Sequence, residues 1–234
     1  MNKQSNVYTV IYIIVLVVVV GTALACTSLA LRDRQQANAD ADKMGQILRS
    51  VGVEAPADQV IDDFNKYITS QLIVRADGTA AEGDAFGIDV AKQVKLPADQ
   101  RELPLFVCTL APGDVKYIIP AYGAGLWGPI WGYVALDADG STIYGAFFSH
   151  QGETPGLGAE IAKPAFCDEF KGKHLFKEGR FMPVAVVKAG MRPLGDEDYV
   201  DGISGGTITS KGVSAMLSDC LTPYQSYLST LQAK

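Results

Sequence analysis

A long apolar segment near the N-terminus limits what this chain can fold into. No charged residue and no histidine occurs from Gln4 to Leu31, and the stretch from Val7 to Ala25 consists mostly of Val, Ile, Leu, Ala and Tyr. A helix needs about 20 such residues to cross a membrane, because its backbone groups must pair internally where no water is present. The sequence therefore predicts a single transmembrane anchor, residues 1–31, that stays in the mature protein.

Two other interpretations of this segment remain open. A cleaved signal peptide would fit the basic start at Lys3 and the small residues Ala23 and Ala25, but the apolar run exceeds the roughly 7–15 residues typical of such peptides. A lipoprotein would need acylation of Cys26, and the residues before it are one place out of the usual order. Basic residues flank the segment on both sides, so charge does not settle its orientation.

The remaining sequence predicts one acidic globular domain. After Leu31 the chain has 26 acidic and 19 basic residues, a net charge of −7, which argues against nucleic acid as a partner. The whole chain of 234 residues is long enough for one core but would be crowded as two domains. The four cysteines have none of the spacings that hold zinc or iron–sulfur clusters, so no metal site is expected, and Cys108 is predicted as a buried thiol.

Apolar periodicity divides this domain into two parts. Residues 32–110 are expected to be helical, with one helix over 32–51 and a second after Pro56. The second part, residues 111–234, is the core of the predicted binding domain. It shows the alternation of apolar and polar residues that is typical of strands and ends in an amphipathic helix over 210–231. The expected strands are 116–120, 129–136, 142–149 and 181–188. Asp139 and Gly140 form the turn of a hairpin. This order predicts an α+β fold.

The segment from Asp201 to Ser210 looks suited to a phosphate group. Gly205 and Gly206 let the backbone approach an anion, and the helix that follows offers unpaired N–H groups and the positive end of its dipole. An ordinary loop with a Ser or Thr helix cap is the competing interpretation. Thr209 and Ser210 are expected to be such caps.

Two more segments carry candidate contacts to a planar ligand. In His150–Ile161, Pro155 and the glycines fix a turn, and Glu153 and Thr154 offer hydrogen-bonding groups, although a purely structural turn would have the same composition. In Gly125–Tyr133, aromatic residues alternate with glycines. Leu126 and Trp127 are the ligand candidates, whereas Trp131 and Tyr133 share one strand face and are expected in the core. His150 and His174 are assigned structural roles. The candidate binding residues are Leu126, Trp127, Glu153, Thr154, Gly156, Leu157, Gly158, Ser204, Gly205, Gly206, Thr207 and Thr209.

Taken together, these segments resemble a known family. The segment ending at Thr207 resembles the flavinylation signature Asp-x-x-Ser/Thr-Gly-Ala-Thr, with Gly206 in place of the usual Ala. The order Gly-Leu-Trp-Gly-Pro-Ile-Trp-Gly, Glu-Thr-Pro-Gly-Leu-Gly-Ala-Glu-Ile and Ser-Gly-Gly-Thr behind one span resembles the C subunit of the sodium-translocating NADH:quinone oxidoreductase. The resemblance covers nearly the whole chain.

The resemblance implies a subunit that carries FMN as a phosphoester of Thr207 and relays electrons, with no catalytic residue of its own. Its complex couples NADH oxidation and quinone reduction to sodium export. The implied partners are the other membrane and peripheral subunits, the lipid membrane and a flavin transferase. The implied location is the inner membrane, with the FMN-binding domain facing the periplasm. The chain itself has no Gly-x-Gly-x-x-Gly dinucleotide signature and no iron–sulfur cysteine cluster.

Three alternative functions stay open at this point. The G subunit of the ferredoxin-linked NAD electron-transport complex has a similar domain, although the Trp127 and Trp131 version of the middle segment looks like the quinone reductase. An extracytoplasmic FMN-binding sensor or lipoprotein would have no electron partner. A membrane-tethered binding module without flavin would be colourless.

Overall fold

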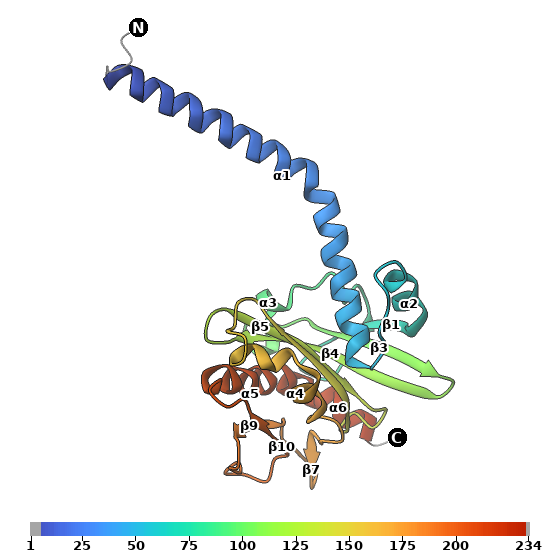
Figure 1. The fold of residues 1–234 in the computed structure, drawn as a ribbon. Coiled ribbons are helices and arrows are strands. Elements are labelled where there is room, and N and C mark those ends of the chain that lie inside the picture. Colours follow the sequence, from blue (N-terminus) through green and yellow to red (C-terminus); the bar gives the residue numbers. More distant parts are fainter. Residues whose placement is uncertain (1–5, 233–234) are drawn as a thin grey trace. The chain divides into compact units, whose positions relative to one another are not determined.

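The computed structural model describes residues 6–232, and its α+β fold confirms the predicted class (Figure 1). The first five residues of the predicted anchor and the last two of the chain lie outside this range. The chain divides into two compact units, Met1–Lys43 and Met44–Lys234. The helix α1 (Asn6–Ser50) begins in the first unit and ends in the second.

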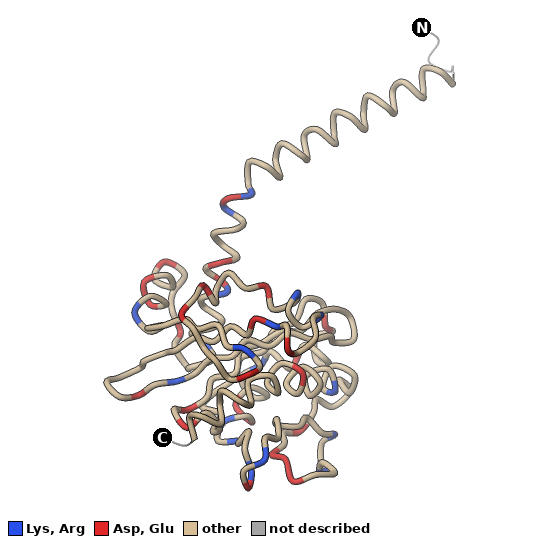
Figure 2. Tube along the Cα trace, turned by 180° about the vertical axis from the view of Figure 1, so that it is seen from behind, with Lys and Arg blue, Asp and Glu red and all other residues tan. Residues whose placement is uncertain are grey.

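From Asn6 onward the first unit is helical. Its part of α1 is long and apolar enough to cross a membrane, which makes it a candidate membrane span. Figure 2 shows that the N-terminal part of α1 carries no charged residue, while charges are scattered over the second unit. The helix predicted over 32–51 exists as the continuation of this span, because the Ala- and Gln-rich sequence after Leu31 has high helix propensity.

The second unit is built on a six-stranded antiparallel sheet in the order β2-β1-β3-β4-β5-β6. Its strands are β1 (Ile68–Val74), β2 (Ala80–Glu82), β3 (Leu103–Ala111), β4 (Asp114–Ala124), β5 (Pro129–Leu136) and β6 (Ile143–His150). The predictions of strands at 116–120, 129–136 and 142–149 are confirmed by β4, β5 and β6. Asp139 turns the chain between the last two by accepting the N–H groups of Ser141 and Thr142.

The prediction that residues 32–110 are helical is wrong for much of that range, since β1, β2 and β3 lie there. Only three short helices follow α1 in it, namely α2 (Val60–Tyr67), α3 (Val90–Gln93) and η1 (Ala98–Gln100). The strands form because β1 pairs with β3 along its length, with Leu72 opposite Leu105. Pairing across more than thirty intervening residues is invisible to local periodicity.

Both faces of the sheet are covered. The helices α4 (Pro164–Asp168) and α5 (Thr207–Leu221) cover one face (Figure 1). Ile130, Val134 and Phe148 belong to the core cluster that includes buried residues of both helices. Trp131 and Tyr133 lie on the opposite face because side chains alternate along β5. That second face also buries Cys108, as predicted. The last turns of α1 and the helix α2 cover it, with Ile47, Leu48 and Phe64 buried there.

Two predicted elements are interrupted by proline. The strand expected at 181–188 is broken at Pro183 into β8 (Arg180–Phe181) and β9 (Ala185–Lys188), because proline cannot donate to a sheet. The helix expected at 210–231 starts earlier, as α5, and Pro223 divides it from α6 (Gln225–Gln232). The remaining elements are η2 (Gly158–Ala162), β7 (Phe176–Lys177), β10 (Tyr199–Gly202) and η3 (Thr222–Tyr224). β9 and β10 form a parallel pair beside α5.

Candidate functional site

The turn between β10 and α5 presents the hydroxyl of Thr207. Gly205 adopts a φ of +76°, and a Cβ atom there would lie 2.6 Å from the Cδ2 atom of Leu157. Gly206 is the N-cap residue of α5 and has no side chain to bond the first-turn N–H groups. Thr207 follows as the first residue of this 15-residue helix, and its side chain is exposed. A phosphate group at Thr207 would meet the positive end of the helix dipole.

The prediction that Thr209 and Ser210 cap the helix is wrong. Both lie inside the first turn and are buried, with 1% and 4% of their surface exposed. Ser210 Oγ accepts a hydrogen bond from the N–H of Ile203 at 2.9 Å, and Thr209 Oγ1 donates to Glu153 Oε2 at 2.5 Å. Both side chains are thus used inside the protein, which leaves Thr207 as the exposed threonine of the first turn.

Glu153 joins the three segments that the sequence singled out. Its side chain is 5% exposed, and its Oε1 atom accepts the N–H of Trp127 at 2.8 Å while Oε2 accepts the hydroxyl of Thr209. The N–H of Glu153 itself donates to Nδ1 of His150 at 3.2 Å. One carboxylate therefore fixes the β4–β5 turn, the segment after β6 and the first turn of α5 in one place.

Several glycines leave room for this carboxylate. A Cβ atom on Gly125 would lie 2.5 Å from Glu153 Oε1, and one on Gly158 would lie 2.5 Å from Thr209 Oγ1. Gly206 is also confined, since a Cβ atom there would lie 3.1 Å from the Cβ atom of Ile203. The sequence predicted Gly158 and Gly206 as contacts to a ligand, whereas protein atoms lie against both in the structure. The same crowding explains why residue 206 is small.

Four apolar side chains stay exposed around this junction. Leu126 and Trp127 stand in the β4–β5 turn and are 48% and 67% exposed, Leu157 adjoins Gly205, and Ile208 follows Thr207. An apolar surface of this kind suits a planar aromatic ligand. Two other candidates contribute to the neighbouring turn. Thr154 accepts the N–H groups of Leu157 and Ala159 on its backbone carbonyl, and Gly156 donates its N–H to Glu160.

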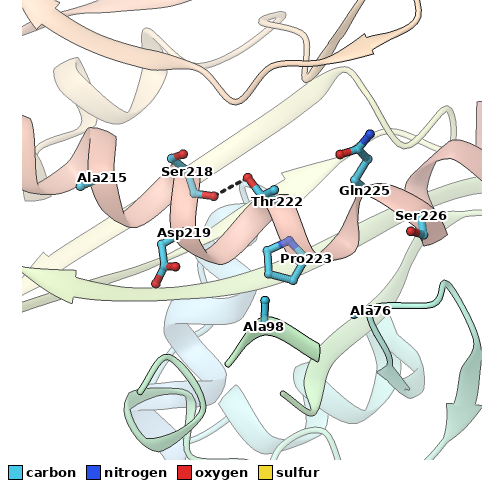
Figure 3. A pocket seen from close by; sticks show the side chains of 9 residues that line it. All are labelled: Ala76, Ala98, Ala215, Ser218, Asp219, Thr222, Pro223, Gln225 and Ser226. Carbon is cyan, nitrogen blue, oxygen red and sulfur yellow. Dashed lines mark hydrogen bonds between the residues drawn. The ribbon is translucent and has the colours of Figure 1, made fainter. Parts of the chain in front are cut away.

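A cavity of about 660 Å³ adjoins Thr207, and the sequence did not predict it. β9, the loop that follows it, the 202–205 turn and α5 line the cavity. A second hollow of about 650 Å³, shown in Figure 3, has Asp219 as its one charged lining residue. The cavity beside Thr207 instead has three basic lining residues, Lys188, Arg192 and Lys211. These lie far apart in the sequence and follow no motif.

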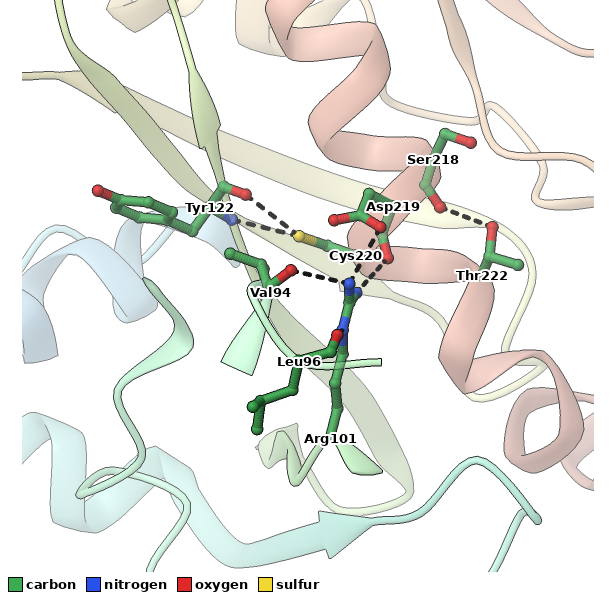
Figure 4. Close-up of polar contacts among 8 residues, drawn as sticks. All are labelled: Val94, Leu96, Arg101, Tyr122, Ser218, Asp219, Cys220 and Thr222. Carbon is green, nitrogen blue, oxygen red and sulfur yellow. Dashed lines mark hydrogen bonds and ion pairs between the residues drawn. The ribbon is translucent and has the colours of Figure 1, made fainter. Parts of the chain in front are cut away.

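The far end of α5 is held by a buried arginine. Arg101 donates hydrogen bonds to the backbone carbonyls of Val94, Leu96 and Asp219, at 2.9, 2.9 and 3.0 Å (Figure 4). On the next residue of α5, the thiol of Cys220 donates to the carbonyl of Tyr122 on β4. These contacts attach α5, the helix on which Thr207 lies, to the sheet.

Metal binding finds no support within residues 6–232, where no group of three or more His, Cys, Asp or Glu side chains could hold an ion.

Burial raises the pKa of Cys108, Cys167 and Cys220 to about 11, so these thiols stay protonated. His150 and His174 bond to Glu153 and Asp198, in keeping with structural roles.

This site belongs to a recognised class of domain. Residues 125–222 match the family described as FMN-binding domain. The match begins at the β4–β5 turn and ends just after α5, so it includes all three segments that Glu153 joins.

The relatives identify the protein family more narrowly. Over 215 residues the chain is 37% identical to the C subunit of the Na(+)-translocating NADH-quinone reductase of Vibrio vulnificus, covering 82% of this chain and 84% of that one. The corresponding C subunit of Yersinia pestis is 32% identical, covering 91% and 87%. The crystal structure of the C subunit from Parabacteroides distasonis superposes with a TM-score of 0.79 at 52% identity, over 85% of this chain and 96% of that one. The chain belongs to the family of C subunits of the Na(+)-translocating NADH-quinone reductase.

Proposed function

We propose that this protein carries FMN bonded through its phosphate to the Oγ atom of Thr207. The observation that carries the proposal is the position of Thr207. Its exposed side chain stands on the first residue of α5, directly after a glycine N-cap that makes no side-chain hydrogen bond. Its competitors Thr209 and Ser210 are buried and hydrogen-bonded. The match to the FMN-binding domain family supports the choice of ligand.

Attachment exchanges one bond for another. The Thr207 oxygen forms a bond to the phosphorus of an activated FMN donor, the bond from that phosphorus to the donor's leaving group breaks, and the hydroxyl proton is released. Among residues 6–232 the structure shows no side chain hydrogen-bonded to Thr207 that would act as the base. A separate flavin transferase as the maturation partner supplies that chemistry.

The residues around Thr207 fit a bound flavin. The apolar side chains of Leu126, Trp127 and Leu157 offer a surface for the ring, and the turn 204–206 with Thr154, Gly156 and Gly158 shapes its surroundings. FMN supplies electron transfer when it is bound, whereas the protein positions it and sets its environment. Glu153 and Thr209 stabilise this arrangement, because their hydrogen bonds hold the β4–β5 turn and the first turn of α5 together.

The protein then relays electrons inside a membrane complex that couples NADH oxidation and quinone reduction to sodium export, as the names of its relatives support. In this proposal, electrons enter from and leave to other subunits of the complex. Residues 1–31 anchor the chain in the lipid of the inner membrane. Residues 32–110 and 111–234 form one domain that faces the periplasm.

Intact-mass analysis of the full chain, purified from its native membrane, tests this proposal. We expect an adduct of the mass of FMN less one water, located on the tryptic peptide that contains Thr207. A Thr207→Val variant should lack the adduct, and a Thr209→Ser variant, which keeps the buried hydroxyl, should retain it. An unmodified Thr207 in a colourless native protein would refute the proposal.

A further inference from the structure

The cavity between α5 and the β9–β10 pair has an unusual charge for this chain. The protein has a net charge of −6, yet the cavity is lined by Lys188, Arg192 and Lys211 against a single acidic residue, Glu197. None of the three basic side chains forms an ion pair within residues 6–232. By contrast, the buried Lys116 and Arg101 both pair with aspartates. The cavity lining thus carries a net positive charge, which the carboxylate of Glu197 offsets only in part.

Thr207 faces this cavity together with one of the basic residues. Lys211 lies four residues after Thr207 and Ser214 seven residues after it, so all three share one face of α5, and all three line the cavity. Thr209 and Val213 lie on the buried side of the helix instead. A group attached to Thr207 therefore starts at the cavity and on the same helix face as the ammonium group of Lys211.

We propose that this cavity is an anion-binding site that receives the phosphate ester of the flavin, with Lys211 as its nearest cation and Lys188 and Arg192 completing the positive lining. The inference rests on the proposed function, because it names the residues that hold the phosphate at Thr207. The volume of about 660 Å³ falls within the range of about 300–1,000 Å³ typical of small-molecule sites. Lysine and arginine are common phosphate-binding side chains in proteins.

This arrangement serves two stages. Before attachment, the three cations attract the phosphate of the donor and bring it to the Thr207 hydroxyl. After attachment, the phosphodiester keeps one negative charge, which Lys211 and the N-terminus of α5 balance. Because all three side chains are exposed, each contributes modestly and its contribution is screened by salt.

A comparison of FMN with riboflavin tests the site, since the two differ by the phosphate alone. The full chain carrying Thr207→Val, purified in detergent from a host without flavin transferase, is titrated with each flavin at low ionic strength. We expect FMN to bind about tenfold more tightly than riboflavin, because three exposed charge pairs add up to about that factor. Lys211→Gln, Lys188→Gln and Arg192→Gln should each weaken FMN binding about two- to fivefold and leave riboflavin binding unchanged.

Lys95→Gln is the matched control, because Lys95 is an exposed lysine that does not line the cavity, and it should change neither affinity. Equal binding of FMN and riboflavin, or binding of neither, overturns the inference. The two proposals fail separately. A native protein without an adduct refutes attachment at Thr207 but leaves a preference for FMN intact, whereas an adduct with no effect of the three substitutions on FMN binding refutes the anion site alone.

Discussion

Glu153→Ala is the substitution that most directly tests how the site is held together. The alanine would remove both carboxylate oxygens, and with them the acceptors of the Trp127 N–H and of the Thr209 hydroxyl. Thr209 is 1% exposed, so its hydroxyl cannot turn to solvent instead. The substitution would therefore release the β4–β5 turn and leave a buried donor unpaired.

The expected loss of stability follows from these two bonds. A hydrogen bond to a charged group contributes about 1.5–3 kcal/mol, so losing two of them predicts a decrease of about 3–6 kcal/mol in the free energy of unfolding. That is a large part of the roughly 5–15 kcal/mol that stabilises a typical domain. Glu153→Gln should lose only about 1–2 kcal/mol, because the amide oxygen still accepts from Trp127 and the amide N–H can donate to Thr209.

Urea unfolding of the full chain in detergent measures both values, followed by tryptophan fluorescence. Trp127 and Trp131 are the two tryptophans of the chain and give the fluorescence signal, and Trp127 lies in the affected turn. Glu82→Gln is the control, since Glu82 is exposed on the edge strand β2. The double variant Glu153→Ala/Thr209→Val should lose less than the sum of the two single losses, because both remove the same bond. A loss below about 1 kcal/mol for Glu153→Ala, or equal losses for Ala and Gln, would contradict the assigned role.

Two further predictions concern the stability of regions away from the candidate site. Arg101→Ala should lower the free energy of unfolding by about 3 kcal/mol, because the carbonyls of Val94 and Leu96 would lose their hydrogen-bond donor. Arg75→Ala, at an exposed position, is the control and should leave the free energy of unfolding unchanged. Burial raises the pKa of Asp139, but hydrogen bonds from Thr142 and Ser141 outweigh it, and the net pKa is lowered. Its contribution is thus present above the unfolded pKa of about 3.9 and is lost as the pH falls through the lower folded pKa. Asp139→Asn should flatten acid unfolding curves in that range, and an unchanged pH dependence would contradict this.

The sequence predicted the parts of the fold that local pattern determines. Strands β4 to β6 were found because alternation and a turn signal coincide, as at Asp139 and Gly140. β1 and β3 were missed because their pairing joins residues such as Leu72 and Leu105 that are distant in sequence. Helix propensity and strand propensity differ by only fractions of a kcal/mol per residue, so tertiary pairing decides such segments.

The site shows the same division between local and long-range information. The three glycine-rich segments were recognisable in the sequence, and the structure brings them together at Glu153. Their connection was not predictable, because nothing in the sequence indicates that Glu153 turns inward to Thr209 rather than outward to a ligand. The cavity was missed for a related reason. Lys188, Arg192 and Lys211 converge only once the β9–β10 pair packs beside α5.

The exposure of the site gives a physical reason for the proposed covalent attachment. Trp127 and Ile208 are more than half exposed, and Thr207 stands at the surface, so a flavin held there would have one side open to solvent. An open position suits electron exchange with a neighbouring subunit, but it provides little buried area for noncovalent affinity. The proposed bond to Thr207 would remove that conflict, because the cofactor would stay in place while its ring remained accessible. The buried network at Glu153 can then serve to keep the attachment point rigid, and need not enclose the ligand.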